Sequence, residues 1–114
     1  MFVQLRALFK TIDFELNTHM DLVAEHIVVL GEVALGTVHI AVTQSSLPEY
    51  PRDISAGNAH VLALAERVAH YATAIRAALE HATNVEDGAT TNIHINISCG
   101  IETQLSLLET YLYQ

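Results

Sequence analysis

The 114-residue sequence has no tryptophan and only five lysines and arginines, against thirteen aspartates and glutamates. Its formal net charge is −8, and no cluster of basic residues occurs anywhere, not even near the ends. Binding to nucleic-acid phosphates requires clustered cations. The composition therefore argues against a nucleic-acid surface, and we do not expect DNA binding.

Cysteine is also scarce. Cys99 is the single cysteine, so no disulfide can form within the chain, and a reducing cytoplasm is the expected location. No run of eighteen apolar residues occurs, which predicts that no helix spans a membrane. The first residues reach Asp13 without a long uncharged segment, so they do not resemble a signal peptide.

The sequence is rich in aliphatic residues. Apolar residues make up 51% of the chain, mostly Ala, Leu, Ile and Val, a composition that favours helices. The length suits one domain over residues 1–114. The two prolines, Pro48 and Pro51, lie close together and mark a connection between helices rather than a domain boundary.

Apolar periodicity predicts three long helices. Residues 2 to 30 carry apolar side chains at steps of three and four, and Gly31 supplies a stop. The expected stripe is Phe2, Leu5, Phe9, Ile12, Leu16, Met20, Val23, Ile27 and Leu30. A second stripe predicts a helix over residues 55 to 83. Residues 90 to 112 also fit a helix, although NIHINIS alternates like a strand.

The segment between the first two long helices is a long connection. Thr37 can cap a short helix over residues 38 to 44, and Thr90 can cap the last long helix. The fold class is therefore all-α, with three long helices and a short crossover helix. Three helices of this length leave one groove open, which a partner subunit or a fourth helix would fill.

Several stretches of this sequence resemble the Dps family of mini-ferritins. HMDLVAEHIVVLGEVALGT is close to the family pattern H-x-D-x-x-A-E-R, followed by an apolar run and L-G-G-x-x-L-G-T. LPEYP is similar to a Pro-Tyr-Pro element of the family. AHVLALAERVAHYATAIRAAL and ISCGIETQLSLLETYL are like its last two long helices. The likeness covers nearly the whole chain.

The resemblance implies a ferritin-like four-helix bundle that forms two-fold dimers within a hollow dodecamer. The family oxidises Fe(II), usually with hydrogen peroxide, and stores the mineral in its cage, which protects against oxidative damage. Many members bind DNA through a basic tail, which has no counterpart here. The family's first long helix also has no counterpart, because Met1 stands where the second one begins.

Asp21 and Glu25 match a carboxylate pair that helps to hold iron in the family. One helical turn apart, they share a helix face and can share a cation, and hard oxygen donors suit iron. By itself the D-x-x-x-E spacing is common on a solvated helix face. With the resemblance, Asp21 and Glu25 are the predicted metal ligands and iron is the predicted metal.

Arg6 and Lys10 stand where the family has a His and, four residues later, an Asp. With a step of about 100° per residue, they share a band of the helix with Asp21 and Glu25. Against an antiparallel copy, Arg6 would meet Glu25 and Lys10 would meet Asp21, because both pairs of numbers add to 31. Cationic side chains would then occupy the space where relatives hold iron. The alternative is four unrelated surface charges.

The seven histidines show no H-x-x-x-H spacing. His19 and His26 lie nearest the carboxylates in the sequence and are the best additional ligands, and adventitious zinc binding is an option. Three functions stay open. One is an iron-binding mini-ferritin with an impaired ferroxidase centre, an enzyme by resemblance only. The others are a non-enzymatic assembly protein with Arg6 and Lys10 in place of metal, and a helical module that binds a partner helix.

Overall fold

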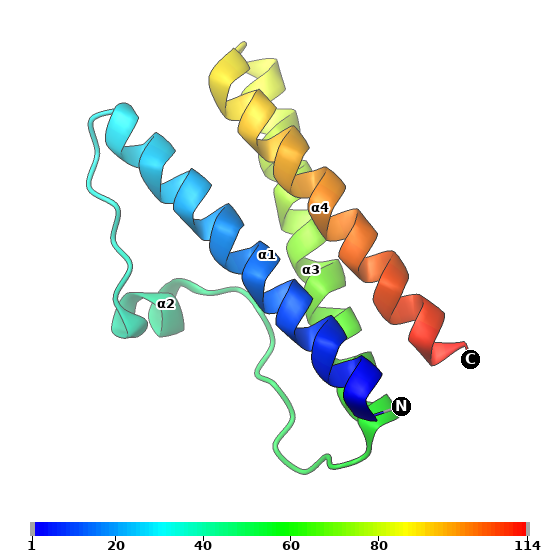
Figure 1. The fold of residues 1–114 in the computed structure, drawn as a ribbon. Coiled ribbons are helices and arrows are strands. Elements are labelled where there is room, and N and C mark those ends of the chain that lie inside the picture. Colours follow the sequence, from blue (N-terminus) through cyan, green and yellow to red (C-terminus); the bar gives the residue numbers. More distant parts are fainter. Residues whose placement is uncertain (1, 114) are drawn as a thin grey trace.

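A computed structural model describes residues 2–113, and in this range the chain is entirely helical, without strands (Figure 1). The four helices are α1 (Phe2–Val29), α2 (Val38–Gln44), α3 (Gly57–Asn84) and α4 (Gly88–Leu112). The predicted all-α class is confirmed, and the arrangement is consistent with a ferritin-like helical bundle. None of these helices is long and apolar enough to cross a membrane.

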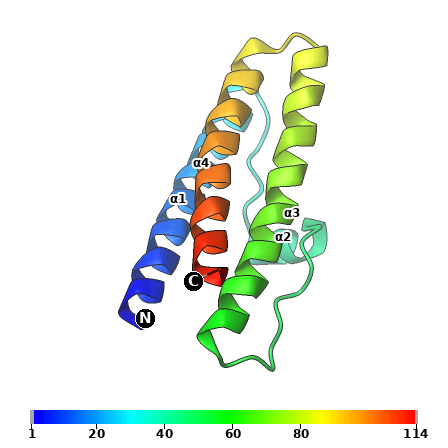
Figure 2. The same cartoon turned by 90° about the vertical axis from the view of Figure 1, so that its right-hand side faces the viewer.

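The long helices lie side by side. α3 and α4 form an antiparallel hairpin along their full length, and α1 packs beside α4 (Figures 1 and 2). The connection that carries α2 runs on the side of the molecule away from α4, as both views show. The predicted short helix in the crossover is therefore confirmed. The alternating segment NIHINIS is helix, because Ile93 and Ile97 continue with Ile101 at a four-residue spacing that packs on the core, whereas Ile95 is exposed.

Two helices end in the same motif. At the end of α1, Gly31 has a φ of +88°, and the Glu32 and Gly31 N–H groups donate to the carbonyls of Ile27 and Val28. This is the pattern of a Schellman cap, in which glycine supplies the left-handed residue. The predicted stop at Gly31 is confirmed.

The turn between α3 and α4 uses the same hydrogen bonds without glycine. Asp87 and Glu86 donate from their N–H groups to the carbonyls of Ala82 and Thr83, and Glu86 takes the left-handed conformation with a φ of 59°. A side chain with a Cβ pays a steric penalty in that conformation. The turn therefore carries local strain that the first helix end avoids.

Capping side chains fix where two helices begin. Thr37 accepts a hydrogen bond from the N–H of Ile40, so its predicted role as the cap of α2 is confirmed. The predicted cap of α4 was wrong: Asp87, not Thr90, is the capping residue, and it accepts from the Thr90 N–H at 3.1 Å. Asp87 stands three residues earlier, within the turn after α3, so α4 begins at Gly88.

The core lies where the three long helices meet. It consists of Leu5, Leu8, Ile12, Val61, Ala65, Val68, Ala72, Ile75, Ile97, Ile101 and Leu108. Two members of the predicted α1 stripe were wrong, because Met20 and Leu30 are each 60% exposed. Met20 borders a hollow between α1 and Tyr71 of α3, and Leu30 follows the last turn of α1. Phe2, also predicted in the stripe, has a side chain outside the described residues.

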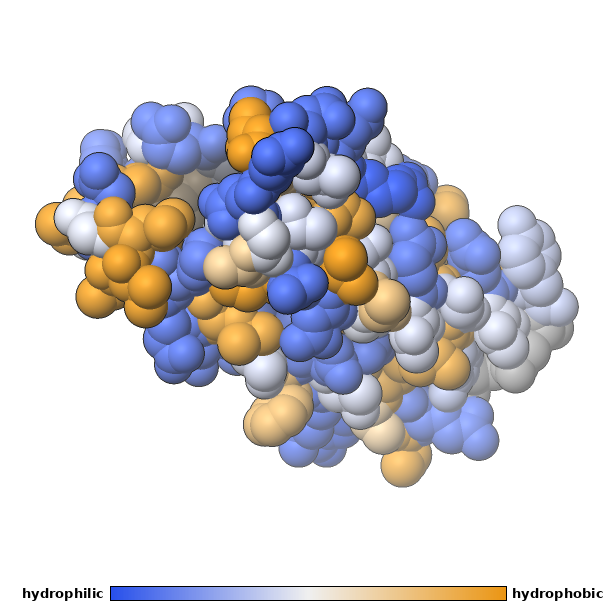
Figure 3. Space-filling view, turned by 90° about the horizontal axis from the view of Figure 1, so that it is seen from above, coloured by the Kyte–Doolittle hydropathy of each residue, from blue (hydrophilic) through white to orange (hydrophobic). Residues whose placement is uncertain are grey.

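The predicted groove lies along the side shared by α1 and α3. Three hollows of 640, 530 and 240 Å³ follow one another there, lined largely by apolar side chains of the two helices. The connection also leaves apolar side chains uncovered. Val33, Leu35, Val38 and Val42 are each more than two-thirds exposed, and Figure 3 shows hydrophobic surface gathered on the side where Figure 1 places α2.

Candidate metal site

The two predicted ligands lie on the outer face of α1. Asp21 and Glu25 are both exposed and one turn apart, so their carboxylates project from the same face of the helix. That face is turned roughly 180° from Ile12, which is buried in the core. Asp21 also borders the 530 Å³ hollow beside α3. The pair is therefore open to an ion and to a second molecule.

Arg6 and Lys10 share this outer face, nearer the start of α1, and both are exposed. Within residues 2–113, none of Arg6, Lys10, Asp21 and Glu25 forms an ion pair. The outer face thus presents two cations at one end and two carboxylates at the other. A single chain does not bring the two ends together.

His19 lies away from the predicted ligands. It is 6% exposed, and its Nε2 lies 3.6 Å from a Glu15 carboxylate oxygen. Gly100 of α4 makes room for it, since a Cβ there would come within 3.0 Å of the same nitrogen. Burial lowers the pKa of His19, and the nearby Glu15 carboxylate only partly opposes this shift. His19 is thus held as a neutral core residue.

His26 contacts the start of α4 instead of a carboxylate pair. Its Nε2 lies 2.7 Å from the Thr90 hydroxyl, which in turn donates to Asp87 at 2.6 Å. The hydrogen bonds from the Thr90 hydroxyl and the Thr90 N–H hold the pKa of Asp87 below its usual range. This chain of contacts ties the last turn of α1 to the cap of α4.

The structure therefore places both histidines apart from Asp21 and Glu25. His19 and His26 are seven residues apart, two helical turns, so both face the core side of α1 while the carboxylates face outward. In the described range, no three His, Cys, Asp or Glu side chains come together as a metal site. Asp21 and Glu25 supply a suitable oxygen pair but an incomplete ligand set.

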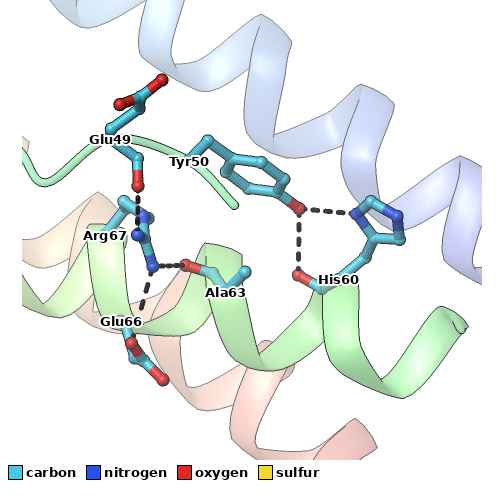
Figure 4. A network of polar contacts seen from close by, with 6 residues as sticks. All are labelled: Glu49, Tyr50, His60, Ala63, Glu66 and Arg67. Carbon is cyan, nitrogen blue, oxygen red and sulfur yellow. Dashed lines mark hydrogen bonds and ion pairs between the residues drawn. The ribbon is translucent and has the colours of Figure 1, made fainter. Parts of the chain in front are cut away.

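The LPEYP segment is fixed on α3 by a polar network (Figure 4). The Tyr50 hydroxyl lies 2.7 Å from Nδ1 of His60, and the two rings stack at 5.8 Å. Arg67 donates to the carbonyl of Glu49 at 2.6 Å and lies 5.6 Å from the Tyr50 ring centroid. These contacts hold the connection against α3, so this histidine also has a structural partner.

Sequence reasoning missed three of these contacts. Glu15 and His19 have the i, i+4 spacing of a helix pair, which was a usable signal. Asp87 and Thr90 have the spacing of a capping residue and its partner. The contact between His26 and Thr90 joins residues 64 positions apart, and no local pattern signals it.

No protein-family model matches the sequence. A curated protein of Agrobacterium fabrum named "DNA protection during starvation protein" is 31% identical to this chain over 113 residues. The match covers 99% of this chain and 70% of that relative. The similarity therefore extends through all four helices, including the part of α1 that carries Asp21 and Glu25.

Proposed function

We propose a function for this chain on the premise that it belongs to the Dps family, the DNA protection during starvation proteins. The protein binds Fe(II) as its substrate at Asp21 and Glu25, oxidises it with low efficiency and stores the product. Removing Fe(II) and peroxide together would protect the cell from oxidative damage. Direct binding to DNA phosphates is not part of the proposal, because the net charge is −8 and no basic cluster exists.

The observation that carries this proposal is the pair of exposed carboxylates on the outer face of α1. Asp21 and Glu25 offer hard oxygen donors with no competing ion pair in the described chain. Two carboxylates leave most of the coordination sphere of an iron ion open. The remaining ligands would come from a second subunit or from water, which leaves room for an oxidant.

Arg6 and Lys10 account for the low efficiency. Both are exposed on the face that carries the carboxylates. A cation that reaches the carboxylates of another copy would repel Fe(II) and compete with it for the same oxygens. Iron binding would then be weak, and the electron transfer that depends on it slow.

The test is oxidation of Fe(II) by hydrogen peroxide, followed at the ferric absorbance on protein of known mass. We expect a rate above buffer that falls about tenfold or more in the double variant Asp21→Asn, Glu25→Gln. Glu80→Gln, Glu109→Gln is the matched control, since it removes two exposed carboxylates of other helices. Equal rates in the two double variants would overturn the assignment of the site.

Arg6 and Lys10 also favour a second candidate, a non-enzymatic assembly protein of the same fold. In this case the cations neutralise the carboxylates across a subunit contact and no iron binds. A rate equal to that of buffer, in protein that assembles normally, would favour this candidate over the first.

A further inference from the structure

We propose that the 640 Å³ hollow between the N-terminal halves of α1 and α3 binds a small organic acid, a molecule with one carboxylate and a short apolar body. The side chains and backbone that line it are those of Leu5, Arg6, Phe9, Lys10, Asp13, Ser55, Gly57 and His60. Its volume lies in the range of small-molecule sites. Neither Asp21 nor Glu25 lines it, so this binding is separate from the proposed binding of Fe(II).

The first argument is the apolar part of the lining. Leu5 belongs to the core, and Phe9 packs against the core while staying partly exposed. Gly57 lets α3 approach α1 closely here, since a Cβ at this position would lie 3.0 Å from Cδ1 of Leu5. An alkyl or aromatic group placed in the hollow would leave water on contact with this apolar surface, which favours binding.

The second argument is the concentration of positive charge. The whole chain has five lysines and arginines and a net charge of −8, yet Arg6 and Lys10 both line this one hollow. They stand one turn apart, and like charges at this spacing repel each other. A carboxylate between them would relieve that repulsion and accept charge-assisted hydrogen bonds. Asp13 is the one carboxylate in the lining, and the two cations outnumber it.

The third argument is the free nitrogen of His60. The Tyr50 hydroxyl lies 2.7 Å from Nδ1 of His60. When this hydroxyl donates to Nδ1, the neutral ring carries its proton on Nε2. Figure 4 shows this second nitrogen on the side of the ring away from Tyr50. Because His60 also lines the hollow, its Nε2–H group supplies a neutral donor for a carboxylate.

The start of α3 adds further donors to the same hollow. Ala56 is the N-cap residue and forms no capping hydrogen bond with its side chain, so the first N–H groups of α3 have no side-chain acceptor. Such groups, together with the helix dipole, favour an anion. The helix end adds to the two cations and does not define the site by itself.

The test titrates sodium hexanoate into the full chain and follows the amide chemical shifts by NMR. We expect the largest changes at the residues that line the hollow, with a Kd of about 1 mM. Acetate, which lacks the apolar body, and hexanol, which lacks the charge, should each bind about tenfold or more weakly. Equal binding of hexanol and hexanoate would overturn the proposal, and so would hexanoate binding elsewhere or not at all.

Charge variants test the recognition of the carboxylate in both directions. Arg6→Gln, Lys10→Gln should raise the Kd for hexanoate about tenfold or more, and Asp13→Asn should lower it about threefold, because the cations attract the ligand and the aspartate repels it.

The matched controls change the net charge equally at exposed positions outside the hollow. Arg52→Gln, Arg76→Gln removes two cations, and Glu109→Gln removes one carboxylate. Both controls should leave the Kd nearly unchanged. A double variant of Arg6 and Lys10 that binds hexanoate as its control does would overturn the proposal.

Discussion

We expect His19 to make the stability of this protein depend on pH. Its ring is buried against Glu15 and Gly100, and burial lowers the pKa of His19 below the usual value near 6.5. The unfolded chain therefore takes up a proton at a higher pH than the folded chain does. The free energy of unfolding should fall as the pH drops below about 6.5, and stop falling from this cause below the folded pKa.

Urea unfolding at a series of pH values measures this slope. His19→Gln should flatten the slope just below pH 6.5, whereas His81→Gln, at an exposed histidine of α3, should keep it. A slope that persists in His19→Gln would mean that another group is responsible.

Arg6 and Lys10 are two positions at which the resemblance to the family predicts other residue types. The family resemblance puts a His and an Asp at these positions, which are ligand types rather than cations. The double variant Arg6→His, Lys10→Asp should raise the rate of Fe(II) oxidation about tenfold or more, since two repulsive charges are replaced by two donors. The ferric absorbance assay measures this, with Arg6→Gln, Lys10→Gln as the control that removes both charges without adding the His and Asp donors. An unchanged rate would show that the two cations do not limit oxidation.

Backbone strain at Glu86 is expected to weaken the turn from α3 to α4. Glu86 occupies the left-handed position of a Schellman cap with a φ of 59°, where glycine is favoured. Glu86→Gly should raise the free energy of unfolding by about 0.5–1 kcal/mol, because the steric penalty outweighs the added freedom of the unfolded chain. Urea unfolding with an unchanged m-value is the measurement.

The matched control is the equivalent position at the end of α1. Gly31 has a φ of +88°, and no atom lies within 4 Å of the position that a Cβ would take. A side chain at this position would therefore meet no neighbour, and its only cost would be the left-handed backbone conformation. Gly31→Ala should lower stability by about 1 kcal/mol. If both substitutions changed stability in the same direction, the left-handed conformation would not be what distinguishes the two turns.

The helices themselves were predictable because their signals are local. Steps of three and four between apolar residues predicted the three long helices. Gly31 predicted the end of α1 and Thr37 the start of the short helix α2. For the candidate site, the directions of the side chains could be predicted, but the contacts between helices could not. The outward direction of Asp21 and Glu25 follows from helix geometry, and so does the inward direction of His19, which lies two turns after the buried Ile12. The space that Gly100 of α4 leaves for the His19 ring is a contact between helices that no spacing within α1 signals.

For the whole molecule, the unequal attachment of the three long helices has a consequence. α3 and α4 pack along their full length, while α1 meets α4 at fewer points, and hollows of 640 and 530 Å³ lie along its uncovered side. Elements with few buried contacts open locally at a lower free energy than the rest of a domain. We therefore expect α1 to open at a lower free energy than the hairpin of α3 and α4.

Amide hydrogen exchange tests this difference. The amides of α1 should exchange about tenfold or more faster than those in the middle of α3 and α4, because α1 opens without disrupting the hairpin. Equal exchange of all three helices would mean that the chain is one cooperative unit, in which α1 does not open separately from the hairpin.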